Sequence, residues 1–164
     1  MKLKNIAGIF LIGMFAFSCK AQKKAIVSTE TASQKSILFP KGEKITNANF
    51  TGTAYLQMLI AADSLNTTSV GNVNFEPGAR TKWHLHPGGQ ILLSTDGVGY
   101  YQEKGQPKKI LRKGDVIKCP PNIQHWLGAS IDPYFVKVAI TNTKNGAPVW
   151  LEAVTNEIYR SLNK

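Results

Sequence analysis

Short runs of β-branched, aromatic and other apolar residues alternate with turn residues over most of the chain. The runs are Ala54–Ile60, Val70–Phe75, Thr81–His86, Gln90–Thr95, Val98–Gln102, Lys109–Leu111, Val116–Cys119, His125–Ala129 and Tyr134–Thr141. Turn sequences such as Glu76-Pro77-Gly78 and Asp96-Gly97 lie between them. Many short strands separated by regular turns are typical of a β-sandwich or barrel. The pattern therefore predicts an all-β domain over residues 37–164.

The end of the chain has a different pattern. Thr155 precedes Asn-Glu-Ile-Tyr-Arg-Ser-Leu, which has no strand alternation. Threonine is a favoured residue before the first turn of a helix, because its hydroxyl accepts a hydrogen bond from a free backbone N–H. We expect a short C-terminal helix with Thr155 as its N-cap.

The first 36 residues have the features of an export signal followed by a tether. A basic start precedes an apolar run over residues 6–17, which is shorter than the roughly 20 residues that span a bilayer. Cys19 follows a small residue, which resembles the lipobox of bacterial lipoproteins, although Phe17 fills a position that is usually smaller. We predict a signal peptide over residues 1–18, lipidation of Cys19 and a flexible tether over residues 19–36. The protein would then be exported and anchored by lipid to the bacterial cell envelope, facing the periplasm. The alternative is an ordinary cleaved signal in which Cys19 has no role.

The charge and the cysteines limit the classes of partner and fold. The net charge is +10, but several of the lysines lie in the tether, and no arginine-rich helix or basic–aromatic motif occurs. We therefore expect no nucleic-acid partner, and contact with a membrane only through the lipid anchor. If Cys19 is lipidated, Cys119 is the remaining thiol, so no internal disulfide is possible. Its apolar surroundings favour a small buried side chain over a reactive one.

The three histidines of the chain point to a metal site. His84 and His86 are two residues apart in a strand, so their side chains project from the same face. Gln90 begins the next strand after a tight turn, and His125 follows a Pro-Pro-Asn turn later in the chain. Three imidazoles and an amide oxygen suit a divalent first-row metal ion. From spacing alone, a surface pair of histidines remains the alternative.

The wider spacing resembles the two motifs of the cupin superfamily. Gly78, five residues, His84-Leu85-His86, three residues, Gln90, six residues and Gly97 are similar to the first motif, with Gln90 in place of the usual glutamate. Gly114, five residues, Pro120, Asn122 and His125 are similar to the second motif, which departs at Asn122 and Ala129. The resemblance implies a double-stranded β-helix, also called a jelly-roll barrel. It also implies a metal ion bound by His84, His86, Gln90 and His125, and a homodimer.

A closer similarity is to the cupin-type hydroxynitrile lyases and their relatives. It rests on the segments 75–81, 83–90, 125–126 and 154–160. It implies Mn2+ as the ion, with Fe2+ or Zn2+ as alternatives, and cleavage or formation of a cyanohydrin. Glutamine leaves the ion's full charge in place, which favours Lewis-acid chemistry on the oxygen of a small carbonyl or hydroxy substrate.

The chain differs from that group at the positions where a residue that transfers the substrate's proton is expected. Leu127 and Lys137 stand where relatives often have histidines, and Thr141 stands where they have an amide. Lys137 could act as the catalytic base if burial lowers its pKa. An exposed strand lysine is the interpretation that the sequence favours.

Alternative functions are a metal-dependent dioxygenase and a non-catalytic envelope protein that binds a small molecule. A sugar isomerase is disfavoured, because the expected additional acid–base pair is missing.

Strand alternation predicts that Trp83 and Trp126 pack away from the pocket, and that Tyr100 and Tyr101 pack within the sheets. For Arg80 the sequence favours a surface ion pair over the steering of an anionic substrate.

Overall fold

The structure is a computed structural model that describes residues 38–161. Its strands are β1 (Glu43–Lys44), β2 (Phe50–Thr51), β3 (Ala54–Ile60), β4 (Thr68–Phe75), β5 (Arg80–Thr81), β6 (His84–Leu85), β7 (Gln90–Glu103), β8 (Lys109–Arg112), β9 (Val116–Cys119), β10 (His125–Ala129), β11 (Phe135–Asn142) and β12 (Val149–Trp150), and its helix is α1 (Asn156–Arg160). The predicted signal peptide, the lipidation at Cys19 and the tether over residues 19–36 lie outside the described residues.

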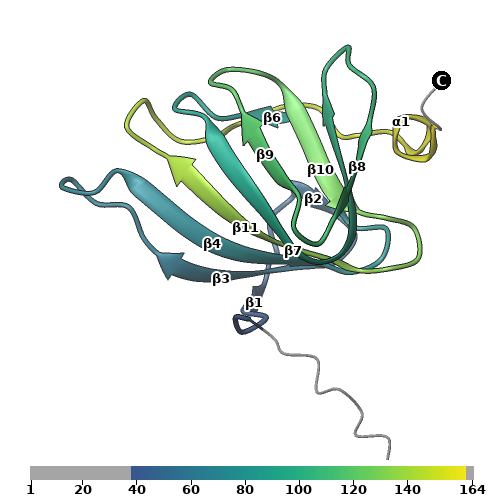
Figure 1. The fold of residues 1–164 in the computed structure, drawn as a ribbon. Helices are drawn as coiled ribbons and strands as arrows, with labels where there is room; N and C mark the ends of the chain where they lie inside the picture. The colour runs from purple at the N-terminus through teal and green to yellow at the C-terminus, as the bar shows by residue number, and fades with distance from the viewer. Residues whose placement is uncertain (1–37, 162–164) are drawn as a thin grey trace, which may run out of the picture. The chain divides into compact units, whose positions relative to one another are not determined.

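Two antiparallel sheets curl against each other, and the long strand β7 belongs to both (Figure 1). The first half of β7 pairs with β9 and β11, in the sheet that also contains β4, β3 and β1. Its second half pairs with β8 and β10, in the sheet that also contains β2, β5, β6 and β12. The predicted all-β jelly-roll barrel with a short C-terminal helix is confirmed.

The predicted turn at Asp96-Gly97 is wrong, because both residues lie inside β7. Gly97 has a φ of 73°, and a Cβ at this position would lie 1.9 Å from the carbonyl oxygen of Tyr134. Glycine is therefore required where β7 leaves one sheet and enters the other. A register shift at Val136/Lys137 on the neighbouring strand β11 lies at the same crossing. The turn residues mark a bend in a continuous strand.

The predicted strand over Thr81–His86 is two short strands, β5 and β6. Between them, the N–H groups of Lys82 and Trp83 donate to the carbonyl groups of Asn49 and Glu152. The chain therefore exchanges partners at this point. The predicted strands Ala54–Ile60, Val116–Cys119 and His125–Ala129 coincide with β3, β9 and β10.

The core fills the space between the two sheets. It contains Ala54, Val73, Phe75, Ala79, Leu92, Tyr101, Leu111, Cys119, Leu127, Ala129, Phe135 and Ala139. A second cluster of Trp83, Trp126, Val154 and Tyr159 packs separately from this core. The predicted packing of the two tryptophans away from the pocket is confirmed, because alternation along β10 turns Trp126 away from its neighbours His125 and Leu127.

The C-terminal segment is fixed by a cap at the start of α1 and by the buried side chain of Arg80. Thr155 Oγ1 accepts from the N–H of Ile158 at 3.2 Å, which confirms the predicted N-cap. The favoured surface ion pair of Arg80 is wrong. Its side chain is buried and donates to the carbonyl oxygen of Val154 at 3.1 Å and to Asn156 Oδ1 at 2.8 Å. These bonds satisfy both Arg80 and the chain just before the helix, so Arg80 has a structural role.

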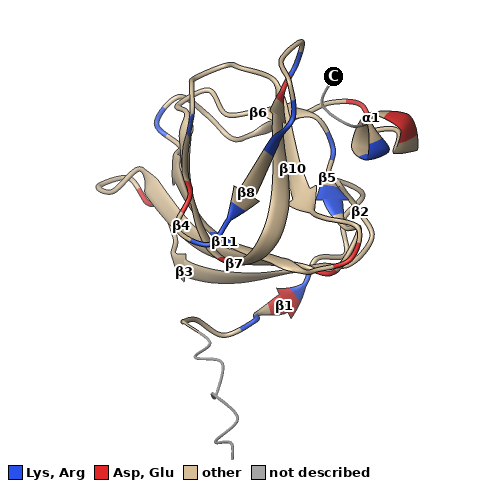
Figure 2. Ribbon diagram, turned by 45° about the vertical axis from the view of Figure 1, so that its right-hand side comes forward, with Lys and Arg blue, Asp and Glu red and all other residues tan. Residues whose placement is uncertain are grey.

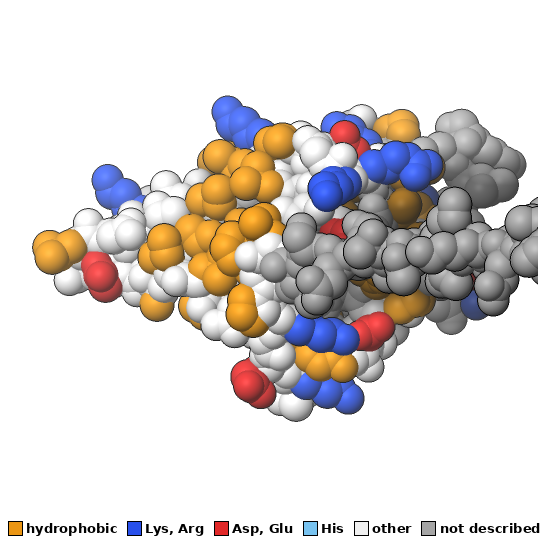
Figure 3. All heavy atoms as spheres, turned by 60° about the horizontal axis from the view of Figure 1, so that its bottom comes forward, with side chains coloured by type: hydrophobic (Ala, Val, Ile, Leu, Met, Phe, Trp, Pro, Cys, Tyr) orange, Lys and Arg blue, Asp and Glu red, His pale blue; other side chains and the backbone are white. Residues whose placement is uncertain are grey.

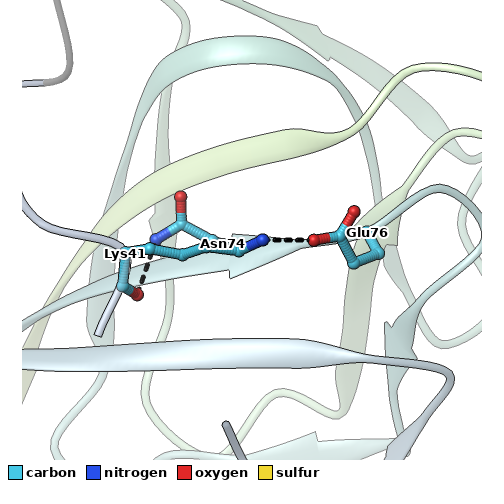
Figure 4. Close-up of polar contacts among 3 residues, drawn as sticks. All are labelled: Lys41, Asn74 and Glu76. Carbon is cyan, nitrogen blue, oxygen red and sulfur yellow. Dashed lines mark hydrogen bonds and ion pairs between the residues drawn. The ribbon is translucent and has the colours of Figure 1, made fainter. Parts of the chain in front are cut away.

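Polar contacts fasten the segment before β1 to β4 (Figure 4). Asn74 Nδ2 donates to the carbonyl oxygen of Lys41 at 3.1 Å, and Lys41 Nζ pairs with Glu76. These groups are exposed, and ion pairs of this kind stabilise a fold by about 0–1 kcal/mol. They position the segment before β1 and contribute little to the free energy of unfolding.

Charged side chains are spread over several elements, and apolar side chains gather on one face. Figure 2 shows lysines and arginines on several strands and loops. Figure 3 shows apolar side chains gathered across one face of the molecule. Ile91 and Val116 are exposed apolar residues of the β7–β9 region. No helix within residues 38–161 is long and apolar enough to cross a membrane. The absence of a nucleic-acid partner and the homodimer both stay predictions.

Candidate metal centre

The three histidines converge inside the barrel. His84 on β6 lies directly opposite His125 on β10, and His86 follows the end of β6. One ring nitrogen from each lies within 4.8 Å of those of the other two. The residues His84, His86 and His125 are 3%, 5% and 0% exposed. A surface pair of histidines is thereby excluded.

Backbone carbonyl groups fix the orientation of two of the rings. His84 Nδ1 lies 3.0 Å from the carbonyl oxygen of Lys82, and His125 Nδ1 lies 2.9 Å from that of Ile123. A carbonyl oxygen only accepts hydrogen bonds, so each Nδ1 carries the proton and each Nε2 keeps its lone pair. This arrangement is typical of histidines that bind a metal through Nε2.

The pKa values of the three imidazoles are all lowered. Burial is the largest cause in each case: it contributes to a pKa of about 3 for His86 and about 4 for His125, and it lowers the pKa of His84 well below its usual value. The positive charge of Lys137 acts in the same direction on all three. The rings are therefore neutral near pH 7, which is the form that binds a metal ion.

Gln90 supplies an amide oxygen in the same part of the barrel. It lies opposite Thr141 on β11, and its Nε2 donates to Thr141 Oγ1 at 2.8 Å. Gln90 Oε1 is buried without a hydrogen-bond partner among the described residues. The same is true of His125 Nε2 and of both ring nitrogens of His86.

These free atoms fit a divalent cation. A buried polar atom without a partner costs about 1–3 kcal/mol. A bound ion would take up the lone pairs of His125 Nε2 and of one ring nitrogen of His86, which belong to the histidine cluster, and Gln90 Oε1 is a further unpartnered buried acceptor. Nitrogen lone pairs and a neutral amide oxygen are suitable ligands for a first-row metal. The residues present thus fit a bound ion, whose identity the donor set leaves open.

Lys137 is buried, so the favoured exposed strand lysine is wrong. It is 4% exposed and shares the inward face of β11 with Phe135, Ala139 and Thr141, all of which are buried. Burial lowers the pKa of Lys137 to about 8. The alternation with Phe135 and Thr141 was visible in the sequence and could have identified Lys137 as an inward-facing residue.

Glu103 and Tyr101 border the histidines. The sequence did not single out Glu103, whereas the predicted packing of Tyr101 is confirmed by its burial in the core. Glu103 lies opposite His125, and its carboxylate accepts from the Tyr101 hydroxyl at 3.0 Å. The Tyr101 ring is 5.4 Å from the His125 ring, and burial raises the pKa of its hydroxyl. A cavity of about 220 Å3 lies beside these residues and is lined by Tyr101, Glu103, Gln106, Pro107 and Lys109.

Cys119 lies in the same interior, opposite Gln90. Burial is the main cause that raises the pKa of its thiol to about 11. A thiol with this pKa stays protonated near pH 7, so the predicted packing role of Cys119 is consistent with its surroundings.

Trp150 was also missed. It lies opposite His84, and the two rings stack with centroids 4.7 Å apart and planes at 26°. No sequence signal marks this contact, because the pairing joins a two-residue strand near the C-terminus to a two-residue strand in the first motif.

Comparisons with known proteins agree with this architecture. The cupin domain family matches residues 71–132. An (R)-mandelonitrile lyase from Granulicella tundricola is 40% identical over 112 residues, which covers 68% of this chain and 86% of the relative. The crystal structure of a cupin-like protein from Thermotoga maritima superposes with a TM-score of 0.72 at 48% identity, covering 75% of this chain and 94% of the other.

A more distant structure shows the same fold. A cupin 2 conserved barrel domain protein from Rhodopseudomonas palustris has a TM-score of 0.58 at 17% identity, over 66% of this chain and 74% of its own. The jelly-roll barrel, the buried histidine cluster and the extended similarity to the mandelonitrile lyase lead to one conclusion: this chain belongs to the cupin family.

Proposed function

We propose that this protein is a metal-dependent carbon–carbon lyase that cleaves or forms the cyanohydrin of a small aldehyde. The observation that carries the proposal is the cluster of three neutral, buried imidazoles, and the buried, unpartnered amide oxygen of Gln90 is the proposed fourth ligand. The relative that is 40% identical is named an (R)-mandelonitrile lyase.

His84, His86 and His125 would hold the ion through ring nitrogens, and Gln90 through Oε1. Mn2+ is the proposed ion, with Fe2+ and Zn2+ as alternatives. When bound, the ion would supply Lewis acidity towards the substrate oxygen. Because all four ligands are neutral, no ligand carboxylate would reduce that acidity.

Lys137 Nζ is the proposed base. In the direction of cleavage it takes the proton of the cyanohydrin hydroxyl, the carbon–cyanide bond breaks, and the electron pair leaves with cyanide. The aldehyde forms, and the proton then passes to cyanide to give HCN. With a pKa of about 8, roughly a tenth of the Lys137 side chains are neutral at pH 7, whereas an ordinary lysine is almost fully charged.

The test is release of cyanide from mandelonitrile by protein whose metal has been removed and restored with Mn2+. We expect release by the wild type, loss of release in His125→Ala together with loss of bound metal, and loss of release in Lys137→Met with metal retained. The matched control is Lys118→Met, which changes an exposed lysine on β9. If the Mn2+-loaded wild type releases cyanide no faster than His125→Ala does, the lyase proposal is wrong.

The same preparation separates the alternatives that the sequence left open. Oxygen consumption with restored iron would indicate a dioxygenase. Bound metal with no turnover in either assay would indicate a binding protein.

A further inference from the structure

Four side chains form a row across four neighbouring strands. Trp150 on β12 lies opposite His84 on β6, His84 lies opposite His125 on β10, and His125 lies opposite Glu103 on β7. Directly opposite residues in antiparallel strands project from the same face of the sheet. The two histidines face the barrel interior, so Trp150 and Glu103 border the same site at its two ends.

Trp150 differs from the other two tryptophans of the chain. Trp83 and Trp126 are 4% and 0% exposed and pack in a cluster separate from the barrel core. Trp150 is only partly buried. Its indole stacks on His84, and the centroid of the Phe50 ring lies 5.9 Å from the centroid of the indole.

The surroundings of the indole are suited to an aromatic ligand. Offset or stacked aromatic pairs with centroids 4.5–7 Å apart gain binding energy beyond their buried area. The Phe50 ring and the imidazole of His84 both contact Trp150, so the indole is part of a larger aromatic cluster. The charged groups Lys137 and Glu103 lie on other strands of the barrel.

We infer that Trp150 is the residue that selects the substrate's side group, and that the site takes aryl rather than alkyl compounds. The inference rests on the proposed function, because it places the ligand's polar oxygen at the histidine cluster. A ligand held there has the indole of Trp150 as a neighbouring surface. A phenyl ring gains a stacking contact with it that a saturated ring of similar size does not gain.

The test is isothermal titration of Mn2+-loaded protein with benzoate, cyclohexanecarboxylate and acetate. All three share the carboxylate, so differences between them report on the side group. In the wild type we expect benzoate to bind about fivefold more tightly than cyclohexanecarboxylate. Trp150→Leu should remove this preference, and Trp150→Phe should retain most of it. Trp83→Phe is the matched control and should leave the preference unchanged.

Two results would overturn the inference. One is a benzoate preference that survives in Trp150→Leu. The other is an equal loss of affinity for benzoate and acetate in that variant, which would mean that the indole acts only by holding His84 in place. Metal content is measured in every variant. Failure of the lyase proposal is a separate result: mandelonitrile would release no cyanide while the benzoate preference and its loss in Trp150→Leu are still observed.

Discussion

Replacing Lys137 with methionine should stabilise the metal-free protein at neutral pH. The two side chains have similar length, and Lys137 is 4% exposed. The folded state must keep a charged ammonium away from water below the pKa of Lys137, whereas the unfolded chain leaves that ammonium in water.

The pKa shift sets the size of the effect. Burial lowers the pKa of Lys137 from 10.5 in the unfolded chain to about 8 in the folded protein. One pKa unit corresponds to about 1.4 kcal/mol, so Lys137→Met should raise the free energy of unfolding by about 3 kcal/mol at pH 7. Between pH 8 and 10.5 the unfolded state binds more protons than the folded state, so the wild type becomes more stable as the pH rises. The part of this advantage that comes from protonation should fall to about 1 kcal/mol at pH 10 and vanish above the unfolded pKa.

Urea denaturation followed by tryptophan fluorescence measures this effect, with a chelator present and at pH 7 and pH 10. The exposed Lys118→Met is the control and should change the free energy of unfolding by no more than about 0.5 kcal/mol at either pH. The reasoning is refuted if Lys137→Met is no more stable than the wild type at pH 7, or if its advantage does not change with pH. A confirmed result would mean that the protein retains a buried lysine at a cost in stability, which is typical of functional residues.

Three further predictions follow from the same structure. Thr141→Val removes the hydrogen bond that orients the Gln90 amide and should weaken metal binding about 10- to 100-fold by titration calorimetry, and an unchanged affinity would show that the orientation does not matter. In the Cys19→Ser protein, Cys119 should react with a thiol reagent only after denaturation, because it is buried and its pKa is raised to about 11; rapid labelling of the folded protein would contradict this. Gly97→Ala should lower the free energy of unfolding by at least 3 kcal/mol, because a Cβ there would lie 1.9 Å from a carbonyl oxygen. Gly105→Ala has a similar positive φ with open space around it and should cost only about 1 kcal/mol, so equal losses in thermal denaturation would refute the steric argument.

Much of the fold could be predicted from the sequence because the patterns that indicate its strands and its helix are local. Alternation and turn residues gave the bounds of β3, β9 and β10, and a single threonine gave the start of α1. The prediction of a turn at Asp96-Gly97 was wrong for a physical reason. A glycine with positive φ is needed both in a tight turn and in a strand that bends between two sheets, and the sequence looks alike in the two cases.

Most of the strands and the three histidines of the site could be predicted from the chain alone, because residue spacing and strand alternation decide which side chains share a face. The enclosure of Lys137, the contact of Arg80 with the C-terminal segment and the stacking of Trp150 on His84 become visible only in the folded barrel. Each of these depends on which strands become neighbours when the sheets close. The packing of the whole barrel determines which distant segments pair, and no local sequence pattern encodes that pairing.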